Sequence, residues 1–426
     1  MTPIRERLGR LPTLADRFSS RRNSIGLIRL TLALGVLVAH SWPLGYGLDD
    51  LGTDFTHRQT NVGQISVYGF FVLSGFLITG SGMRFTIGRF AWHRFLRIFP
   101  GFWVCLLVTA LVFAPLVAIY ERGTLAGFFT HPAGPFDFLV GNWFTAMRQH
   151  PISGLLTETP YGERVGGPSA FNGSLWSLRY ELICYILVGA LAVTAVLRKA
   201  PRAVFLLFAI FYLIIVRDFS NAADVFSRPP ARGTAGPYPL IGGFSLDSLI
   251  YLTFMFLCGA AARVYQHRLP MHGAIASVAA VGLLGSMWQG GFIIIGMPAF
   301  AYLLLYVSVA LPSWTHSIGR DRDYSYGIYI YAFPVQQSIS LLGGNQWGVA
   351  VYILLSAAGT MLLAIPSWHL IERPVMKLKD YEPGFVRRMR DGTAPATDPP
   401  VAAAQPGPAA AEPALAKPAP AAVPAP

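Results

Sequence analysis

The chain has 426 residues, of which 53% are hydrophobic and only 13% are charged, and its formal net charge is +12. Soluble domains usually carry about 25% charged residues, so this composition excludes an ordinary soluble protein and requires surrounding lipid. The Lys and Arg residues cluster beside apolar runs, where basic residues fix the orientation of membrane proteins. Because no nucleic-acid-binding motif accompanies them, we expect no nucleic-acid partner.

The segment 1–23 is basic and precedes the first apolar run. No small-residue cleavage site follows that run, so we expect a retained first helix and not a removed signal peptide. The cysteines Cys105, Cys184 and Cys258 lie inside apolar runs, without paired spacing or a Cys/His cluster. The sequence therefore favours buried thiols over a disulfide framework or a zinc site, and we expect no metal.

Apolar runs long enough to cross a bilayer recur along most of the chain. A membrane-spanning helix needs roughly 20 residues, with about 17–25 as the usual range. This criterion predicts ten spans, at 25–42, 65–81, 98–119, 173–197, 202–217, 248–266, 272–288, 290–308, 324–342 and 346–371. We therefore predict an all-α fold, a polytopic integral membrane helical bundle with about ten transmembrane helices.

The distribution of Lys and Arg predicts the orientation of this bundle. Basic clusters lie at 5–22, 84–97, 198–202, 263–268, 320–322 and 373–390. With ten spans, all of them fall on one side, which is the cytoplasm by the usual bias, so both termini are predicted to be cytoplasmic. The segments 120–172 and 218–247 then lie on the outer side. The short apolar piece at 136–147 is predicted to be interfacial or re-entrant.

The C-terminal part of the chain differs in composition from the rest. Beyond about residue 391 it is Ala and Pro with almost no large apolar residue, which predicts a disordered cytoplasmic tail. The predicted organisation is a basic cytoplasmic segment 1–23, a transmembrane domain 24–380 and a tail 381–426.

Ionisable side chains inside membrane spans are energetically expensive, so each is a candidate for function. Arg29 and His40 are eleven residues apart in the first span, which places them on one helix face about 16 Å apart along its axis. Pro43 is predicted to close this helix. Histidine can accept a proton from a hydroxyl, and Arg29 can orient a partner or bind an anion. The alternative is a snorkelling Arg29 and a hydrogen-bonded His40 at opposite interfaces.

The segment 69–82, GFFVLSGFLITGSG, combines apolar residues with small ones, including Ser74 and Gly75. Small residues let another helix, or a narrow ligand, approach the backbone closely. Nothing in the sequence supplies Ser74 with a neighbouring base, so we do not predict that it is a nucleophile.

Arg94 and Arg97 lie in the run WHRFLRIFP at the cytoplasmic end of the third span. They are three residues apart and therefore on one side of a helix. Paired guanidinium groups suit phosphate recognition. Ordinary anchoring by basic residues at the cytoplasmic interface explains them equally well.

The segment 172–185, NGSLWSLRYELICY, carries Trp176, Arg179 and Glu181 into an apolar helix. Arg179 and Glu181 are two residues apart and do not face each other. Glu181 therefore needs a partner from another span or a solvated cavity, and a structural ion pair between helices is the alternative to a catalytic role.

Together these segments resemble the membrane acyltransferase family often called acyltransferase 3. The resemblance runs from about residue 24 to residue 372 and rests on the spacing of Arg29 and His40, FFVLSGFL at 70–77, RFLRIFP at 94–100 and NGSLWSLRYE at 172–181. SYGIYIYAFPVQ at 325–336 and IERP at 371–374 add weaker support. Many relatives have a histidine near the position of Ala332, and this chain departs from them there.

The resemblance implies an O-acyltransferase of the bacterial cytoplasmic membrane. Such an enzyme moves an acyl group, usually acetyl, from acyl-CoA to a hydroxyl of a cell-envelope or secreted carbohydrate or glycolipid. The matching histidine is His40, and the matching arginines are Arg29, Arg94 and Arg97. No metal is required.

A mechanism follows as a hypothesis. The nucleotide end of acyl-CoA docks on the cytoplasmic side against Arg94 and Arg97, with Ser74 and Trp176 as further donor contacts. His40 removes the proton of the acceptor hydroxyl, and Glu181 holds either the histidine tautomer or a nearby arginine. The main alternative is a secondary transporter or exporter of a small anionic or glycosylated compound, because transport pathways also contain buried Arg and Glu.

Overall fold

The computed structural model describes residues 11–227, 229–381 and 384. Most of the segment 1–23 is described, but the predicted tail falls almost wholly outside the described residues. The limits of the three predicted segments therefore stay predictions. Helices are almost the only regular secondary structure of the described chain.

Ten long helices form the body of the molecule. They are α2 (Ile25–Tyr46), α3 (Val62–Gly82), α4 (Ile87–Val108), α8 (Leu178–Val193), α10 (Arg202–Ser220), α11 (Leu246–Val264), α12 (Gly273–Gln289), α13 (Met297–Ala310), α14 (Ser325–Leu341) and α15 (Val349–Pro366). The short helices are α1 (Leu14–Arg17), α5 (Ala114–Arg122), α6 (Pro135–Asn142), α7 (Pro160–Val165), α9 (Val196–Lys199) and α16 (Arg373–Met376).

Irregular helical turns extend several of these elements. A π-turn at Thr109–Phe113 joins α4 to α5, another at Phe292–Gly296 precedes α13, and a third at Ser367–Glu372 follows α15. A 3₁₀ turn at Ser174–Ser177 leads into α8. Among the described residues, eight helices are long and apolar enough to cross a membrane.

The prediction of a polytopic all-α membrane protein is confirmed. Each of the ten predicted spans corresponds to a helix, although α12 and α14, with 17 residues each, are shorter than the eight clear membrane helices. The apolar piece predicted to be interfacial contains only the eight-residue α6, which is too short to cross a bilayer.

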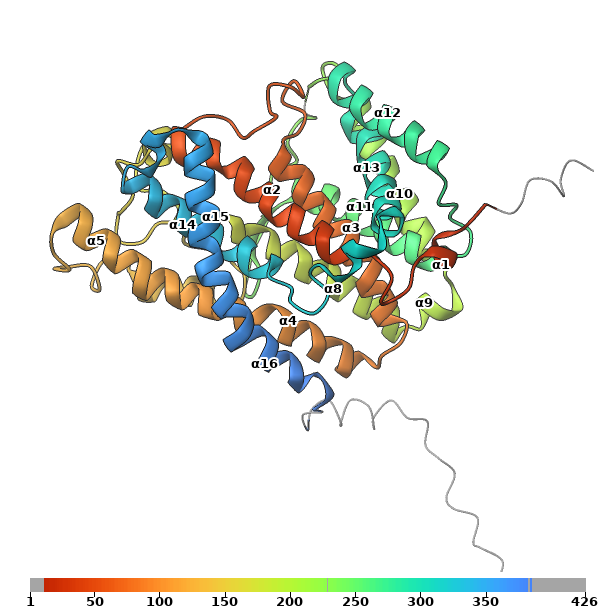
Figure 1. Cartoon of the computed structure of the whole chain (residues 1–426), viewed down its shortest axis with the longest axis horizontal. Helices are drawn as coiled ribbons and strands as arrows, with labels where there is room; N and C mark the ends of the chain where they lie inside the picture. The colour runs from red at the N-terminus through yellow and green to blue at the C-terminus, as the bar shows by residue number, and fades with distance from the viewer. Residues whose placement is uncertain (1–10, 228, 382–383, 385–426) are drawn as a thin grey trace, which may run out of the picture.

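Helices α2 and α3 lie side by side in the centre of the bundle (Figure 1). On one side of them, α11 packs against α3, and α10, α12 and α13 lie beyond it. On the other side, α14 and α15 pack against α2. The glycines Gly75 and Gly259 make the contact between α3 and α11 possible, since a Cβ at Gly75 would lie only 1.9 Å from the carbonyl oxygen of Phe256.

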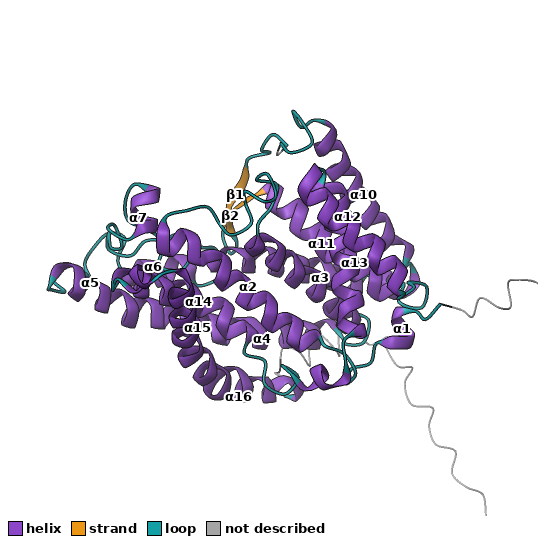
Figure 2. Ribbon diagram, turned by 45° about the horizontal axis from the view of Figure 1, so that its top comes forward, coloured by secondary structure: helices purple, strands orange, loops and turns teal. Residues whose placement is uncertain are grey.

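The outer segments carry the only sheet among the described residues. Strands β1 (Thr234–Tyr238) and β2 (Gly242–Ser245) form an antiparallel hairpin, which the sequence analysis did not predict. The hairpin and α7 lie on one side of the bundle, opposite α16 (Figure 2). We call the side of α16 inner, because the basic clusters assign it to the cytoplasm, and the hairpin side outer.

Two predicted helix limits were wrong. Pro43 does not close the first helix, because proline removes a donor and crowds only the turn before it. The helix α2 continues to Tyr46 and ends at Gly47, whose φ of 65° is left-handed. The third span begins at Ile87 instead of residue 98 and runs through α5 to Arg122, so that Arg94 and Arg97 lie inside a membrane helix.

Candidate active site

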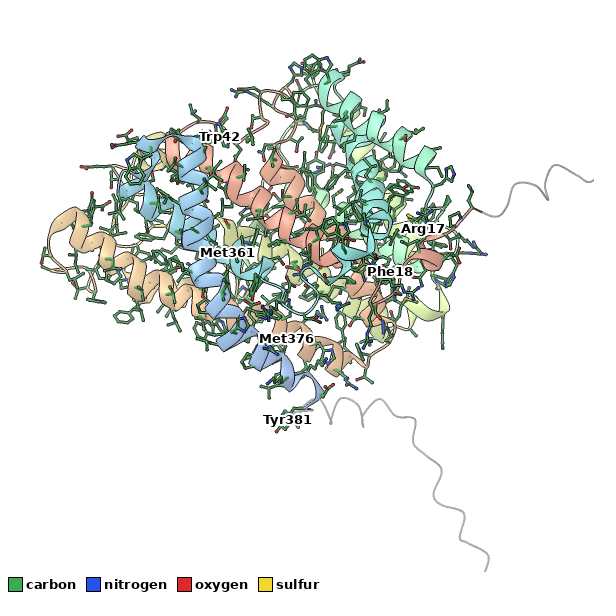
Figure 3. The ribbon with its side chains drawn as sticks, viewed as in Figure 1. Arg17, Phe18, Trp42, Met361, Met376 and Tyr381 are labelled. Carbon is green, nitrogen blue, oxygen red and sulfur yellow. The ribbon has the colours of Figure 1, made fainter. Side chains whose placement is uncertain are left out.

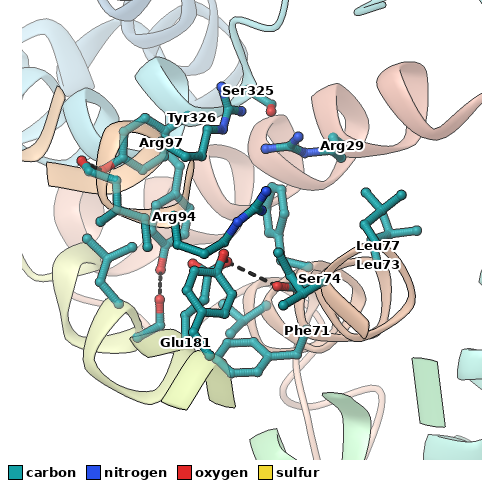
Figure 4. A pocket seen from close by; sticks show the side chains of 18 residues that line it. Arg29, Phe71, Leu73, Ser74, Leu77, Arg94, Arg97, Glu181, Ser325 and Tyr326 are labelled. Carbon is teal, nitrogen blue, oxygen red and sulfur yellow. Dashed lines mark hydrogen bonds between the residues drawn. The ribbon is translucent and has the colours of Figure 1, made fainter. Parts of the chain in front are cut away.

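A cavity of about 120 Å³ lies between α2, α3, α4, α8 and α14 (Figure 4). Charged and polar side chains from all five helices line it, among them Arg29, Ser74, Arg94, Arg97, Glu181 and Tyr326. The cavity therefore brings together every predicted site residue except His40 and Trp176. Residues that are up to about 300 positions apart in the sequence meet here because α14 packs on α2.

Asp323 joins two of these arginines at the inner end of the cavity. Its Oδ2 atom lies 2.7 Å from Nη1 of Arg29 and 2.6 Å from Nη2 of Arg97. Glu372 approaches Nη1 of Arg97 at 3.7 Å. Arg97 is thus neutralised by carboxylates of the protein itself, and the prediction that it pairs with Arg94 to bind phosphate needs this correction.

Asp323 precedes the first turn of α14 and also accepts hydrogen bonds from the backbone N–H and the hydroxyl of Ser325. Burial alone would raise the pKa of this carboxyl, but Arg29 and Arg97 outweigh burial and lower the pKa to about 2. The sequence analysis missed Asp323. The available signal was an acidic residue just before the apolar helix, in the run Arg-Asp-Arg-Asp at 320–323.

Glu181 has a hydrogen-bond partner from another membrane helix, as its position inside an apolar helix predicted. Its Oε1 atom accepts a hydrogen bond from Oγ of Ser74 on α3, 3.2 Å away, and another from the hydroxyl of Tyr185 one turn along α8. Arg94 is a nearby positive charge. Glu181 therefore organises the cavity wall, and among the described residues it makes no contact with His40.

Arg94 differs from Arg97 in its surroundings. Its guanidinium lies 5.9 Å from the ring centre of Tyr185 and points into the same space as that of Arg29 (Figure 4). Among the described residues Arg94 forms no ion pair, and its Nε atom is buried without a hydrogen-bond partner. The side chain also hydrogen-bonds to Tyr185, so it is the Nε–H of Arg94 that remains available to a ligand.

His40 lies near the outer end of α2 and does not line the cavity. Its Nδ1 atom is 3.3 Å from Oδ1 of Asp50, which comes from the loop after α2. The imidazole packs edge-on against the ring of Phe333, with centroids 5.6 Å apart, and its side chain is 23% exposed. Asp50, and not Glu181, is therefore the carboxylate that contacts the imidazole, through its Nδ1 atom.

Trp176 is not brought to the cavity, although its neighbour Ser177 lines it. The indole packs edge-on against Tyr180, with ring centroids 5.5 Å apart. Arg179 donates to the carbonyl of Gly243 in the β-hairpin, so it supports the outer segment and forms no pair with Glu181. The assignment of Trp176 as a donor contact finds no support in this geometry.

The model of a family described as an acyltransferase domain, acyltransferase 3, matches residues 22–369. The chain belongs to this family. Nodulation protein 10 of Rhizobium leguminosarum bv. viciae is 30% identical to this acyltransferase over 386 residues, covering 85% of this chain and 96% of that protein. The O-acetyl transferase of Shigella phage Sf6 is 28% identical over 362 residues, covering 83% and 96%. No solved structure matches the acyltransferase.

The matched region of the acyltransferase contains both parts of the candidate site. It includes the inner cavity with Arg94 and Glu181, the ion pair of Arg29 with Asp323, and His40. Among the residues that the structure describes, no group of His, Cys, Asp or Glu side chains could hold a metal ion, and the three cysteines are free thiols. The side chains themselves can supply a base, hydrogen-bond donors and positive charge.

Proposed function

We propose that this multi-pass protein of the bacterial cytoplasmic membrane transfers an acyl group, by preference acetyl, from acyl-CoA to a carbohydrate hydroxyl. The acceptor is a polysaccharide or glycolipid of the cell envelope, reached from the outer side. Membership of the acyltransferase family and the likeness to a protein called O-acetyl transferase support the reaction class.

The observation that carries the proposal is that α2 bears a candidate site residue near each of its two ends, Arg29 and His40. Near its inner end Arg29 lines a cavity that holds a second guanidinium, that of Arg94, whose Nε has no hydrogen-bond partner among the described residues. Near its outer end His40 is held by Asp50 and is partly exposed. One helix thus carries a cationic donor side and a basic acceptor side about 16 Å apart.

The proposed reaction is a single acyl transfer. The acceptor hydroxyl gives its proton to the free imidazole nitrogen of His40, while its oxygen bonds to the thioester carbonyl carbon. The carbon–sulfur bond then breaks, and the CoA sulfur leaves with the electron pair and takes up the proton from the imidazolium. The products are an O-acyl ester and free CoA thiol, and His40 returns to its starting state.

Within this proposal, Arg94 binds the acyl-CoA donor. Its free Nε–H matches the amide carbonyl oxygens of the pantetheine arm, and a guanidinium in a dry cavity binds polar ligands strongly. Arg29 and Arg97 act through their contact with Asp323, which fixes the inner end of α2 against α4 and α14. Positioning of the two substrates supplies most of the rate gain that such a site can give.

The experiment is transfer of radiolabel from [acetyl-¹⁴C]acetyl-CoA to envelope carbohydrate in membranes that contain the native protein or His40→Ala. We expect label only with the native protein, at equal amounts of membrane-inserted chain. His267→Ala, which removes an exposed histidine on the inner side, is the matched control and should keep full transfer.

Label that persists in His40→Ala would overturn the role of His40. Absence of label with the native protein across acyl-CoA donors and acceptor preparations would overturn the transfer reaction itself. Flux of a labelled glycoside across vesicles without any dependence on acyl-CoA would then support the transporter instead.

A further inference from the structure

A second pocket opens on the inner side, next to the cavity. It has a volume of about 400 Å³ and shares Arg29, Leu77 and Arg97 with the cavity wall, so the two spaces adjoin. Its other walls come from the segment before α2, the inner ends of α2, α3 and α11, the loop before α14, the π-turn after α15, and α16. We call this space the inner basin.

Two arginines of the inner basin differ from Arg29 and Arg97, which form ion pairs with Asp323. Arg84 and Arg263 line the basin, and each is a charged neighbour of the other. Among the described residues neither forms an ion pair with a carboxylate. Arg84 is exposed and Arg263 is half-buried, so both guanidinium groups are accessible to an anionic ligand, which would also offset their mutual repulsion.

The position of Arg263 is fixed by its surroundings and not by a counter-charge. Its guanidinium lies over the rings of Phe76 and Phe18, at 5.1 and 5.7 Å, and its Nη1 donates to Gln266. Phe18 lies between α1 and the start of α2 (Figure 3). A Cβ added at Gly80 would lie 2.6 Å from Nε of Arg263. The glycine therefore leaves room for a guanidinium held flat against the helix.

Two buried polar atoms of the basin are also without partners. Trp368 is only 8% exposed, and its indole Nε1 has no hydrogen-bond partner among the described residues. The Nε2 atom of His316 is in the same condition. Both side chains line the basin. Buried donors are normally satisfied, so a ligand with acceptor oxygens would complete this wall.

We propose that the inner basin binds the phosphate groups of the nucleotide end of acyl-CoA, with Arg84 and Arg263 as the phosphate-binding residues. Guanidinium groups bind phosphate oxygens through paired hydrogen bonds, and the indole N–H of Trp368 adds a neutral donor. The inference rests on the proposed function, because it assumes that acyl-CoA is the donor. It moves the phosphate site from Arg94 and Arg97 to the basin beneath them.

Because the inner basin adjoins the cavity, one acyl-CoA molecule can occupy both spaces. With its phosphates in the inner basin, the pantetheine arm passes the shared residues Arg29 and Leu77 and enters the cavity beside Arg94. The same phosphate chemistry is offered by an anionic phospholipid headgroup of the inner leaflet, and the test must separate the two sources.

The test compares acetyl-CoA with acetyl-pantetheine, which keeps the thioester arm and lacks the nucleotide and its phosphates. Native protein and the double variant Arg84→Ala/Arg263→Ala are reconstituted in nanodiscs of phosphatidylcholine, with and without phosphatidylglycerol. The kcat/KM for each donor and the equilibrium binding of radiolabelled CoA are measured. Arg268→Ala removes an exposed inner arginine outside the basin and is the matched control.

We expect the double variant to lower the ratio of kcat/KM for acetyl-CoA to that for acetyl-pantetheine by about 10- to 100-fold, the range for loss of charge-assisted hydrogen bonds. CoA binding should weaken by a similar factor in both lipid compositions. Gly80→Ala, which displaces the Arg263 guanidinium without removing its charge, should lower the ratio by a smaller factor. Arg268→Ala should keep the native ratio within about twofold.

An unchanged ratio, or equal loss with both donors, would overturn the nucleotide site. A loss of binding that appears only with phosphatidylglycerol present would assign the arginines to a lipid headgroup and overturn it as well. If the native protein transfers from neither donor, the proposed function fails. CoA binding that depends on Arg84 and Arg263 would then still support the basin as a nucleotide site, and absence of CoA binding would overturn it.

Discussion

Helix α2 forms one contact between a basic and an acidic side chain at each end, and the two contacts differ. At the inner end Arg29 lies 2.7 Å from Asp323, which also holds Arg97 at 2.6 Å. At the outer end His40 lies 3.3 Å from Asp50, and no second basic group among the described residues forms an ion pair with that carboxylate. The inner contact ties three helices together, whereas the outer contact links α2 only to its own following loop.

This difference suggests separate roles for the two pairs: the Arg29–Asp323 pair holds helices together, and the His40–Asp50 pair serves the proposed acid–base chemistry. Arginine stays charged under all ordinary conditions, and a carboxylate shared by two guanidinium groups makes a permanent contact. Histidine changes its protonation during acid–base catalysis, so a single carboxylate at one ring nitrogen orients the ring and leaves the other nitrogen free. The inner pair therefore stabilises the fold, and in the proposed mechanism the outer pair orients the base.

The largest expected effect follows from removing the shared carboxylate. Asp323→Asn leaves Arg29 and Arg97 partly buried without their main counter-charge, and loss of one partner of a buried pair costs about 3–5 kcal/mol. We expect a much lower melting temperature in detergent and loss of transfer activity. Asp321→Asn, in which an exposed carboxylate 3.5 Å from Arg320 is removed, should melt like the native protein. Equal melting of all three proteins would contradict the structural role of Asp323.

The second effect concerns activity and not stability. Asp50→Asn weakens the orientation of His40, and we expect kcat to fall about 10- to 100-fold, a part of the 10²–10⁴-fold that general base catalysis supplies. The KM for acyl-CoA and the melting temperature should stay native, because Asp50 is a positioning residue on the outer side. Asp50→Glu should recover part of kcat. The neighbouring Asp49→Asn, which loses contacts with Arg164 and Arg58, serves as control. A native kcat in Asp50→Asn would show that the carboxylate does not act on His40.

A smaller effect tests the packing between the cavity wall and His40. Phe333 contacts His40 and lies one helical turn from Tyr329, which lines the cavity. Its ring therefore packs against His40 within one helical turn of the cavity wall. Phe333→Leu should cost about 1 kcal/mol of stability and change kcat by a few-fold, with the KM for acyl-CoA unaltered. A change confined to that KM would place Phe333 on the donor side instead.

The smallest effect is the pH dependence of the inner pair. The pKa of Asp323 is lowered to about 2 from an ordinary value of 3.8, so its stabilising contribution is fully present above about pH 4 and is lost as the pH falls toward 2. The melting temperature should therefore not respond to this pair between about pH 5 and 8. In Arg29→Gln the pKa of Asp323 rises toward its ordinary value, so acid loss should begin at a higher pH. If the melting temperature of Arg29→Gln and that of the native protein fell over the same acidic pH range, the pairing of Arg29 with Asp323 would be contradicted.

The fold was largely predictable because membrane spans are encoded locally. Each predicted span contains a long apolar run, and hydropathy finds such runs without knowledge of contacts. The β-hairpin was missed because Thr234–Tyr238 and Gly242–Ser245 are short and rich in Gly. The start of α4 was misplaced because Arg94 and Arg97 interrupt the apolar pattern, and only the carboxylates that reach Arg97 from other helices explain its position inside the bundle.

The candidate site was predictable only in part. Arg29 and Glu181 stand out because charge in an apolar run is expensive, and the structure brings them to one cavity. Asp323 and Asp50 were missed because both lie in loops, where acidic residues are ordinary. Trp176 was predicted to contact the donor because of its motif, but it packs on Tyr180. Partnership between distant segments is a tertiary property that spacing along the chain does not reveal.

The helix that runs from Ile87 to Arg122 has 36 residues, so it is about 54 Å long, against about 30 Å for the hydrocarbon core of a bilayer. Its inner part is tied to Asp323 by Arg97, and its outer end is tied to the outer segment by Glu121 and Arg122, which bond to Leu156 and Ser153. Such a helix answers a thinner or thicker membrane by changing its tilt. A change of tilt therefore changes the angle between this helix and the elements that hold its two ends, the inner ion pairs and the outer segment.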